Sequence, residues 1–231
     1  MQFDIVEIWG QATGPVKFVI LTMGAMGVGS IYVALERAWA LTKARNPSRA
    51  LAGELAGAFA KGDGAAAVQL ANKPEYKDSY LGHLLVPGLN EFLARKDRHG
   101  IEAAERALQR VSIAEDASLR KGFGILATTG ATCPFVGLVG TIFGIIGAFQ
   151  AMAEGGGNLD KLLLPIAEAL IATAIGIAVA ILGVWLYNWF NHKVEMITKD
   201  MNTAALELLD WCEKQLLSSD SASDSPPAAQ A

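Results

Sequence analysis

Residues 122–153 read GFGILATTGATCPFVGLVGTIFGIIGAFQAMA and contain no charged side chain over 32 consecutive positions. Two other stretches, residues 18–35 and 169–192, are also uncharged, over 18 and 24 positions. A helix of about 20 apolar residues is long enough to cross the hydrocarbon core of a bilayer. The three stretches therefore predict an all-α integral membrane protein with three transmembrane helices.

The composition agrees with a membrane protein. Hydrophobic residues make up 52% of the 231 positions and charged residues only 18%, whereas a soluble domain carries about 25% charged residues. A soluble enzyme, a secreted scaffold and a disordered chain are therefore disfavoured. The net charge of −4 gives no basic surface for nucleic acid. Cys133 and Cys212 lie far apart in the sequence and form no CxxC motif, so we expect neither a disulfide framework nor a zinc site. No constellation of His, Cys, Asp and Glu in the sequence suits a metal, and we expect no cofactor.

The first apolar stretch has two possible interpretations, a retained transmembrane helix or a cleaved signal peptide. A signal peptide begins with a basic segment, but here Asp4 and Glu7 precede the stretch and Lys17 is its only preceding cation. The stretch also continues to Trp39, a residue typical of membrane interfaces. We therefore favour the retained helix.

The distribution of cations predicts the orientation. Of the 19 Lys and Arg residues, 14 lie between Arg37 and Lys121, and cations are retained on the cytoplasmic side. The N-terminus is therefore expected outside and the C-terminus inside. The expected segments are a periplasmic N-terminus (1–15), the first transmembrane helix (16–41), a cytoplasmic helical region (42–121), the second transmembrane helix (122–153), a periplasmic turn (154–164), the third transmembrane helix (165–192), a cytoplasmic helix (193–217) and a disordered tail (218–231).

Local signals predict several helix boundaries in the cytoplasmic region. Asn46-Pro47 is typical of a helix start, and Asp63 and Asp78 are expected to cap two further helices. No proline interrupts residues 101–133, which predicts one helix that runs from the cytoplasm into the second span. The third span is likewise expected to continue to Leu217, so that both spans extend into a cytoplasmic bundle.

Small residues form a stripe on one face of each of the last two spans. Such stripes let helix backbones approach closely in lipid. The residues are Gly137, Gly140, Gly144 and Gly147 in the second span, and Ala172, Gly176, Val179 and Gly183 in the third.

Glu168 is the acidic residue near the start of the third span, and it has two interpretations. It follows Pro165, which suits a helix start, and an acid there is stabilised by the helix dipole. Alternatively it lies inside the hydrocarbon, where an ionisable group is a functional candidate. Threonines accompany it in both spans; each alone is expected to bond its own helix, but together they could line a path for protons. They are Thr128, Thr129, Thr132, Thr141 and Thr173.

Two longer motifs resemble a known family. Residues 129–145, TGATCPFVGLVGTIFGI, resemble the second-span signature of the ExbB/TolQ/MotA proton-channel family. Residues 165–176, PIAEALIATAIG, resemble its third-span signature, and Tyr187-Asn188 follows at a matching place. Three spans fit the ExbB and TolQ branch of the family.

The resemblance implies a proton-channel subunit, and not an enzyme, in the bacterial inner membrane. It implies a pentameric ring around a pore that holds a single-span partner similar to ExbD or TolR, whose membrane aspartate carries the protons. Glu168, Thr141 and Thr173 match the family's proton path, and Pro134 and Gly137 match its packing residues. The uncharged stretches contain no aspartate, which is consistent with a carrier from another subunit.

The resemblance leaves the client process open. TonB-dependent transport, Tol-Pal-type envelope maintenance and gliding motility, with a TonB-, TolA- or gliding-machinery partner, are all compatible with it. We prefer protons to sodium as the ion. The alternative function is a structural membrane scaffold without ion flux, which uses the glycine stripes for assembly.

Overall fold

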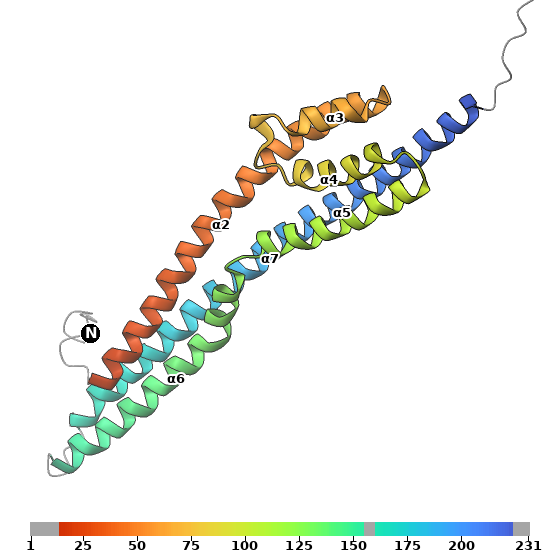
Figure 1. The fold of residues 1–231 in the computed structure, drawn as a ribbon. Coiled ribbons are helices and arrows are strands. Elements are labelled where there is room, and N and C mark those ends of the chain that lie inside the picture. Colours follow the sequence, from red (N-terminus) through yellow and green to blue (C-terminus); the bar gives the residue numbers. More distant parts are fainter. Residues whose placement is uncertain (1–13, 155–159, 224–231) are drawn as a thin grey trace, which may run out of the picture. The chain divides into compact units, whose positions relative to one another are not determined.

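The structure, a computed structural model, describes residues 14–154 and 160–223, and these form helices joined by short turns (Figure 1). The predicted all-α class is therefore confirmed for the described residues. The helices are α2 (Gly14–Ala60), α3 (Gly64–Ala71), the 3-10 turn η1 (Pro74–Tyr76), α4 (Tyr80–Ala94), α5 (Arg98–Leu119), α6 (Phe123–Glu154) and α7 (Asp160–Ser223). Most of the predicted N-terminal segment, the middle of the outer turn and the end of the tail lie outside the described residues.

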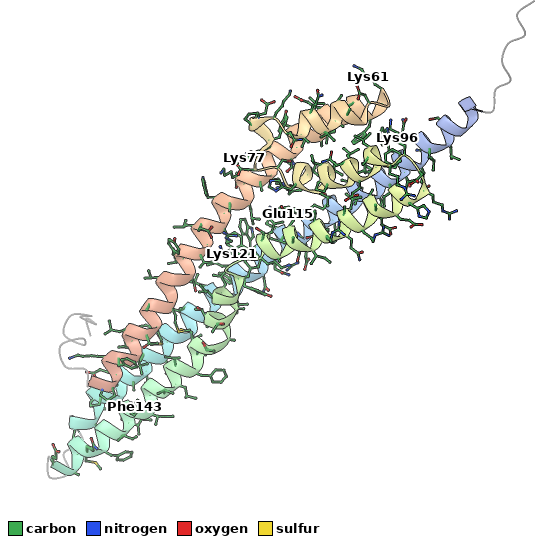
Figure 2. All side chains as sticks on the ribbon, in the orientation of Figure 1. Lys61, Lys77, Lys96, Glu115, Lys121 and Phe143 are labelled. Carbon is green, nitrogen blue, oxygen red and sulfur yellow. The ribbon has the colours of Figure 1, made fainter. Side chains whose placement is uncertain are left out.

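Three of these helices, α2, α6 and α7, are long and apolar enough to cross a membrane. The chain divides into two compact units. The span unit comprises the described residues of 14–37 and 122–191, and the bundle unit comprises 38–121 and 192–223. Labelled charged residues such as Lys96 and Glu115 belong to the bundle unit, whereas Phe143 belongs to α6 of the span unit (Figure 2).

In the span unit, α6 and α7 approach each other through small residues. A Cβ atom added to Gly144 would lie 2.5 Å from the Cβ of Ala169, and one added to Gly137 would lie 3.1 Å from the Cα of Thr173. A Cβ on Gly130 would lie 2.6 Å from a methyl group of Val184. As residue numbers rise along α6 they fall along α7, so the two helices run antiparallel with little space between their backbones.

The core of the span unit includes residues from all three helices. Val19 and Met23 of α2, Cys133 of α6 and Ala172 and Ala180 of α7 form one buried apolar cluster. Pro134 and Gly147 of α6 are half-buried.

In the bundle unit, α4 packs against α5 and α3 packs against α4. The indole of Trp211 on α7 lies between two phenylalanines, with ring centroids 5.2 Å from Phe59 and 6.0 Å from Phe92. Its Nε1–H donates to the carbonyl of Phe59 over 3.0 Å. Large buried side chains fill the rest of this core, among them Leu51, Leu84, Leu89, Phe92, Leu108, Met201 and Leu208.

Two of the predicted helix caps can be compared with the structure. Asp63 caps α3 as predicted, and its Oδ1 accepts from the backbone N–H of Ala66 over 2.8 Å. The prediction that Asp78 caps the next helix is wrong, because Ser79 does so by accepting from the N–H of Gly82 over 3.1 Å. The carboxylate of Asp78 instead pairs with Lys43 Nζ at 3.0 Å.

The prediction of one helix from the cytoplasmic region into the second span is also wrong. α5 ends at Leu119 and α6 begins at Phe123. Between them Gly122 has a φ of +85°, which lies in the left-handed region that glycine adopts without penalty and that is common at helix ends. The sequence argument considered only proline as a helix breaker and overlooked this glycine.

Pro47 and Pro165, by contrast, do not mark helix starts as predicted. α2 continues through Pro47 and α7 begins at Asp160, five residues before Pro165. A proline inside a helix costs about 3 kcal/mol because one backbone hydrogen bond is lost. Near Pro47, Leu51 and Ser48 are fully buried, and the Ser48 hydroxyl donates to the carbonyl of Ala44 over 2.8 Å. α7 remains helical to Ser223, through the first residues of the predicted tail, and residues 224–231 lie outside the described residues.

Candidate proton-path site

The candidate residues lie near contacts among the three helices of the span unit. A Cβ on Gly140 would lie 3.1 Å from Val19 Cγ1 of α2 and 3.2 Å from the Cβ of Ala172 of α7. One turn later, a Cβ on Gly144 would lie 3.2 Å from the carbonyl oxygen of Pro165. This crowding fixes the positions of the neighbouring polar side chains.

The hydroxyl of Thr173 makes a hydrogen bond between two helices. Its Oγ1 donates to the carbonyl of Gly137 on α6 over 2.8 Å. Each threonine was expected to bond a carbonyl of its own helix, so the bond of Thr173 to another helix differs from the prediction. It arises because Gly137 has no side chain, which lets α7 approach the α6 backbone, and because a carbonyl oxygen can accept two hydrogen bonds.

Thr141 lies one turn after Gly137 on α6 and is half-buried. Its Oγ1 donates to the carbonyl of Leu138 over 2.7 Å, within the same helix. Thr132 makes a similar local bond to the carbonyl of Thr128 over 2.7 Å. The expected local bonding is therefore correct for Thr132 and Thr141. Gly137, whose carbonyl accepts from the Thr173 hydroxyl, and Thr141 therefore lie on successive turns of α6.

Glu168 is buried within the span unit, with only 5% of its surface exposed. It precedes Thr173 by five residues, which places the two about 140° apart around α7 at about 100° per residue. Lys17 of α2 is the cation whose charge interacts with the Glu168 carboxylate.

Sequence reasoning missed two polar residues of the span unit. Lys17 was counted only as an isolated cation, because its proximity to Glu168 arises from helix packing and not from sequence spacing. Ser30 of α2 was not considered, yet its hydroxyl donates to Thr129 Oγ1 over 3.0 Å between two buried side chains. A serine among glycines in the first apolar stretch was the available signal for this contact.

Metal ligation is not indicated at this site. Within residues 14–154 and 160–223, no group of three or more His, Cys, Asp or Glu side chains is arranged to hold a metal ion. Cys133 and Cys212 are free, buried thiols in different units.

The described site combines three apolar helices, close packing at glycines and the Thr173 hydroxyl bonded between two of the helices. Residues 77–203, more than half of the 231, match the model of the family described as the MotA/TolQ/ExbB proton channel family. The chain belongs to this family, which confirms the resemblance of its two span motifs. The family is defined by transport, and not by catalysis.

Relatives from two branches of the family are similar to the chain. Biopolymer transport protein ExbB of Xanthomonas campestris pv. campestris (strain B100) is 40% identical over 125 residues, which are 54% of this chain and 47% of that protein. ExbB of Pseudomonas putida is 34% identical over 161 residues, 67% of this chain and 49% of the relative. Tol-Pal system protein TolQ of Pseudomonas aeruginosa (strain PAO1) is 33% identical over 159 residues, 66% of this chain and 68% of the relative. The chain spans about half the length of the ExbB relatives it matches.

Proposed function

We propose that this chain is the proton-channel subunit of an inner-membrane motor that couples the proton motive force to mechanical work on an envelope partner. The proposal depends on the hydrogen bond that the Thr173 hydroxyl of α7 donates to the Gly137 carbonyl of α6. The hydroxyl of Thr141 lies on the next turn of α6. In a chain of the proton-channel family, these two hydroxyls support a proton path between the second and third spans.

Hydroxyls at such a seam suit proton transfer for a physical reason. A hydroxyl both donates and accepts and can rotate between partners, whereas helix backbone groups in lipid are already bonded to each other. One elementary charge that crosses 100 mV releases about 2.3 kcal/mol. This energy is enough to bias two conformations of an assembly if proton transfer is coupled to them.

The proposed carrier of the protons is a partner subunit. The three uncharged stretches of this chain contain no aspartate, so we assign the alternating carboxylate to a single-span, ExbD/TolR-like partner with a membrane aspartate. Glu168 is assigned to the outer end of the path, where Lys17 supplies a neighbouring positive charge.

The proposed topology follows the cation count. Residues 16–41, 122–153 and 165–192 span the membrane, residues 42–121 and 193–217 are cytoplasmic, the N-terminus is periplasmic and the C-terminus is cytoplasmic. The working form is a homopentamer in lipid. The similarity to both ExbB and TolQ relatives supports TonB-dependent transport and Tol-Pal-type maintenance as client processes, with gliding as a third.

The test compares threonines that differ in their bonding. We expect Thr173→Val to abolish motor output, because valine has a similar shape but no hydroxyl, and Thr173→Ser to retain part of it. Thr132→Val is the matched control, since Thr132 bonds only its own helix and is exposed. Output is measured in cells as TonB-dependent uptake and as resistance of the outer membrane to detergent, at equal expression.

One observation favours the scaffold alternative: the Thr173 hydroxyl joins two helices and therefore has a structural use. Native mass measurement of the purified complexes separates the two functions. A proton channel predicts that Thr173→Val and Glu168→Gln complexes assemble normally but do no work. If both variants assemble and support full output, the proton path is wrong.

A further inference from the structure

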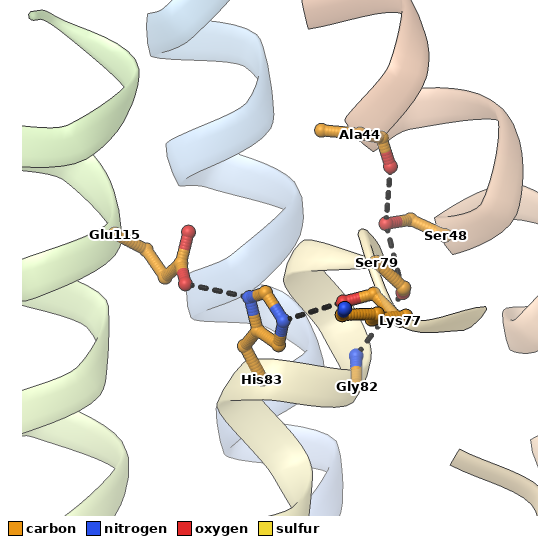
Figure 3. Close-up of polar contacts among 7 residues, drawn as sticks. All are labelled: Ala44, Ser48, Lys77, Ser79, Gly82, His83 and Glu115. Atoms are coloured by element: carbon orange, nitrogen blue, oxygen red, sulfur yellow. Dashed lines mark hydrogen bonds and ion pairs between the residues drawn. The ribbon is translucent and has the colours of Figure 1, made fainter. Parts of the chain in front are cut away.

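His83 of the bundle unit contacts two hydrogen-bond acceptors at once (Figure 3). Its Nδ1 lies 2.8 Å from Oε1 of Glu115 on α5, and its Nε2 lies 2.8 Å from the carbonyl oxygen of Lys77 in the turn before α4. The three groups therefore connect α5, α4 and the preceding turn through one imidazole ring.

This geometry depends on the protonation of the ring. A neutral imidazole carries one N–H, whereas the imidazolium carries two. A carboxylate and a carbonyl only accept, so both contacts are hydrogen bonds only when His83 is an imidazolium. When the ring loses a proton, one nitrogen lone pair faces an oxygen lone pair, and that contact becomes repulsive.

The charged surroundings favour the imidazolium. The hydrogen bond with Glu115 is the main cause that raises the pKa of His83; partial burial opposes it, and the Lys77 carbonyl and the charges of Glu115 and Asp78 add to it. Lys43 pairs with Asp78, and Lys73 lines the same surface hollow as His83. The His83 side chain is 49% exposed, so it exchanges protons with solvent.

The contact of His83 is continuous with other contacts of the bundle unit. Ser79, in the same turn as Lys77, caps α4, and its hydroxyl lies 3.0 Å from that of Ser48 on α2 (Figure 3). On α5, the residue after Glu115 is Asp116, whose Oδ1 accepts from the Thr198 hydroxyl of α7 over 2.8 Å. Among these contacts, the one at His83 involves a group that titrates near neutral pH.

We propose that His83, Glu115 and the Lys77 carbonyl form a proton-operated clamp that fastens α5 to α4 in acid and releases it as the solution becomes alkaline. The proposal rests on the proposed function in one respect, the compartment whose pH the clamp senses. In the proposed topology this compartment is the cytoplasm. Proton entry on that side would then tighten α5, the helix that precedes the second span.

The sign of the pH dependence follows from the raised pKa. Below the unfolded value of about 6.5, His83 is charged in both folded and unfolded chains and the clamp contributes its full stabilisation. The contribution is lost as the pH rises through the higher folded value. The release is therefore expected above pH 6.5.

The experiment measures hydrogen exchange of the purified full-length chain in detergent between pH 6 and 8.5, corrected for the intrinsic exchange rate. We expect several-fold faster exchange in residues 80–94 and 108–119 at the alkaline end. His83→Gln and Glu115→Gln should each abolish this pH dependence. The matched control is His99→Gln, because His99 lies 3.7 Å from Glu102 on an exposed surface.

A second measurement does not depend on any variant. Nitrogen NMR of histidine-labelled wild-type chain should show both ring nitrogens of His83 protonated in acid and a transition above the ordinary histidine value of about 6.5. Exchange that is independent of pH, or a His83 transition at or below that value, would overturn the clamp. Neither readout requires proton flux, so failure of the proposed motor function would be seen separately.

Discussion

In the span unit, glycines of one helix lie directly against the backbone of the neighbouring helix. In the bundle unit, large side chains fill the space between the helices. Gly176 shows the first case: a Cβ there would lie 2.9 Å from the carbonyl oxygen of Cys133 and 3.1 Å from the Cα of Gly137. Phe92 shows the second, since it is 2% exposed and packs against Trp211. The comparison indicates that the glycine contacts between α6 and α7 are sensitive to added atoms, while the aromatic core of the bundle unit is sensitive to lost ones.

The two cysteines allow this difference to be measured in one molecule. Cys133 is fully buried in the span unit and Cys212 is fully buried in the bundle unit. A buried thiol reacts with a labelling reagent only after local opening. Single-cysteine variants, Cys133→Ser and Cys212→Ser, therefore report the opening of each unit separately.

The largest expected effect is that of Phe92→Ala. Removal of a buried aromatic ring costs about 3–5 kcal/mol because it leaves a cavity. We expect much faster labelling of Cys212 and little change at Cys133. Leu206→Ala is the control, because Leu206 is 65% exposed in the same unit. Equal acceleration at both thiols would show that the two units open together.

The second effect is that of Gly176→Val, which adds atoms to the span unit. Overpacking of a tight contact costs about 1–3 kcal/mol or more, so labelling of Cys133 should accelerate while that of Cys212 stays constant. Gly24→Ala is the matched control, because a Cβ at Gly24 meets no atom within 4 Å. If Gly176→Val leaves Cys133 protected, backbone approach is not what holds α6 to α7.

The smallest effect concerns the start of α4. Ser79→Ala removes a helix cap and should cost about 1 kcal/mol, seen as a modest increase in Cys212 labelling. Asp78→Ala removes only an ion pair whose side chains are nearly half exposed, which is worth about 0–1 kcal/mol. A larger effect of Asp78→Ala than of Ser79→Ala would contradict the assignment of the cap.

The sequence predicted the parts of the fold that depend on local patterns. Three apolar stretches gave the three long apolar helices, and the glycines at 137, 140 and 144 lie at helix contacts. The break at Gly122 was missed because only proline was considered as a helix breaker, although glycine is common just after a helix end. Continuation of α2 through Pro47 was missed because the Asn-Pro pattern, typical of a helix start, lies inside this helix.

The candidate site was predicted less completely than the fold. The hydroxyls could be found from composition, but the partner of Thr173 depends on how closely α7 approaches Gly137. Glu168 and Lys17 come together only through packing of α2 and α7, which no spacing in the sequence reveals. The side of α7 on which Glu168 lies could have been obtained from its five-residue separation from Thr173.

Gly122 separates two helices at a place where α2 and α7 each pass without interruption from one unit to the other. A continuous helix transmits twist along its axis, because each hydrogen-bonded turn constrains the next. A glycine in the left-handed region carries no such constraint, so torsion can be absorbed by a few dihedral angles there. The second span therefore begins as a new helix at Phe123, whereas the first and third spans are each continuous with helical residues of the bundle unit.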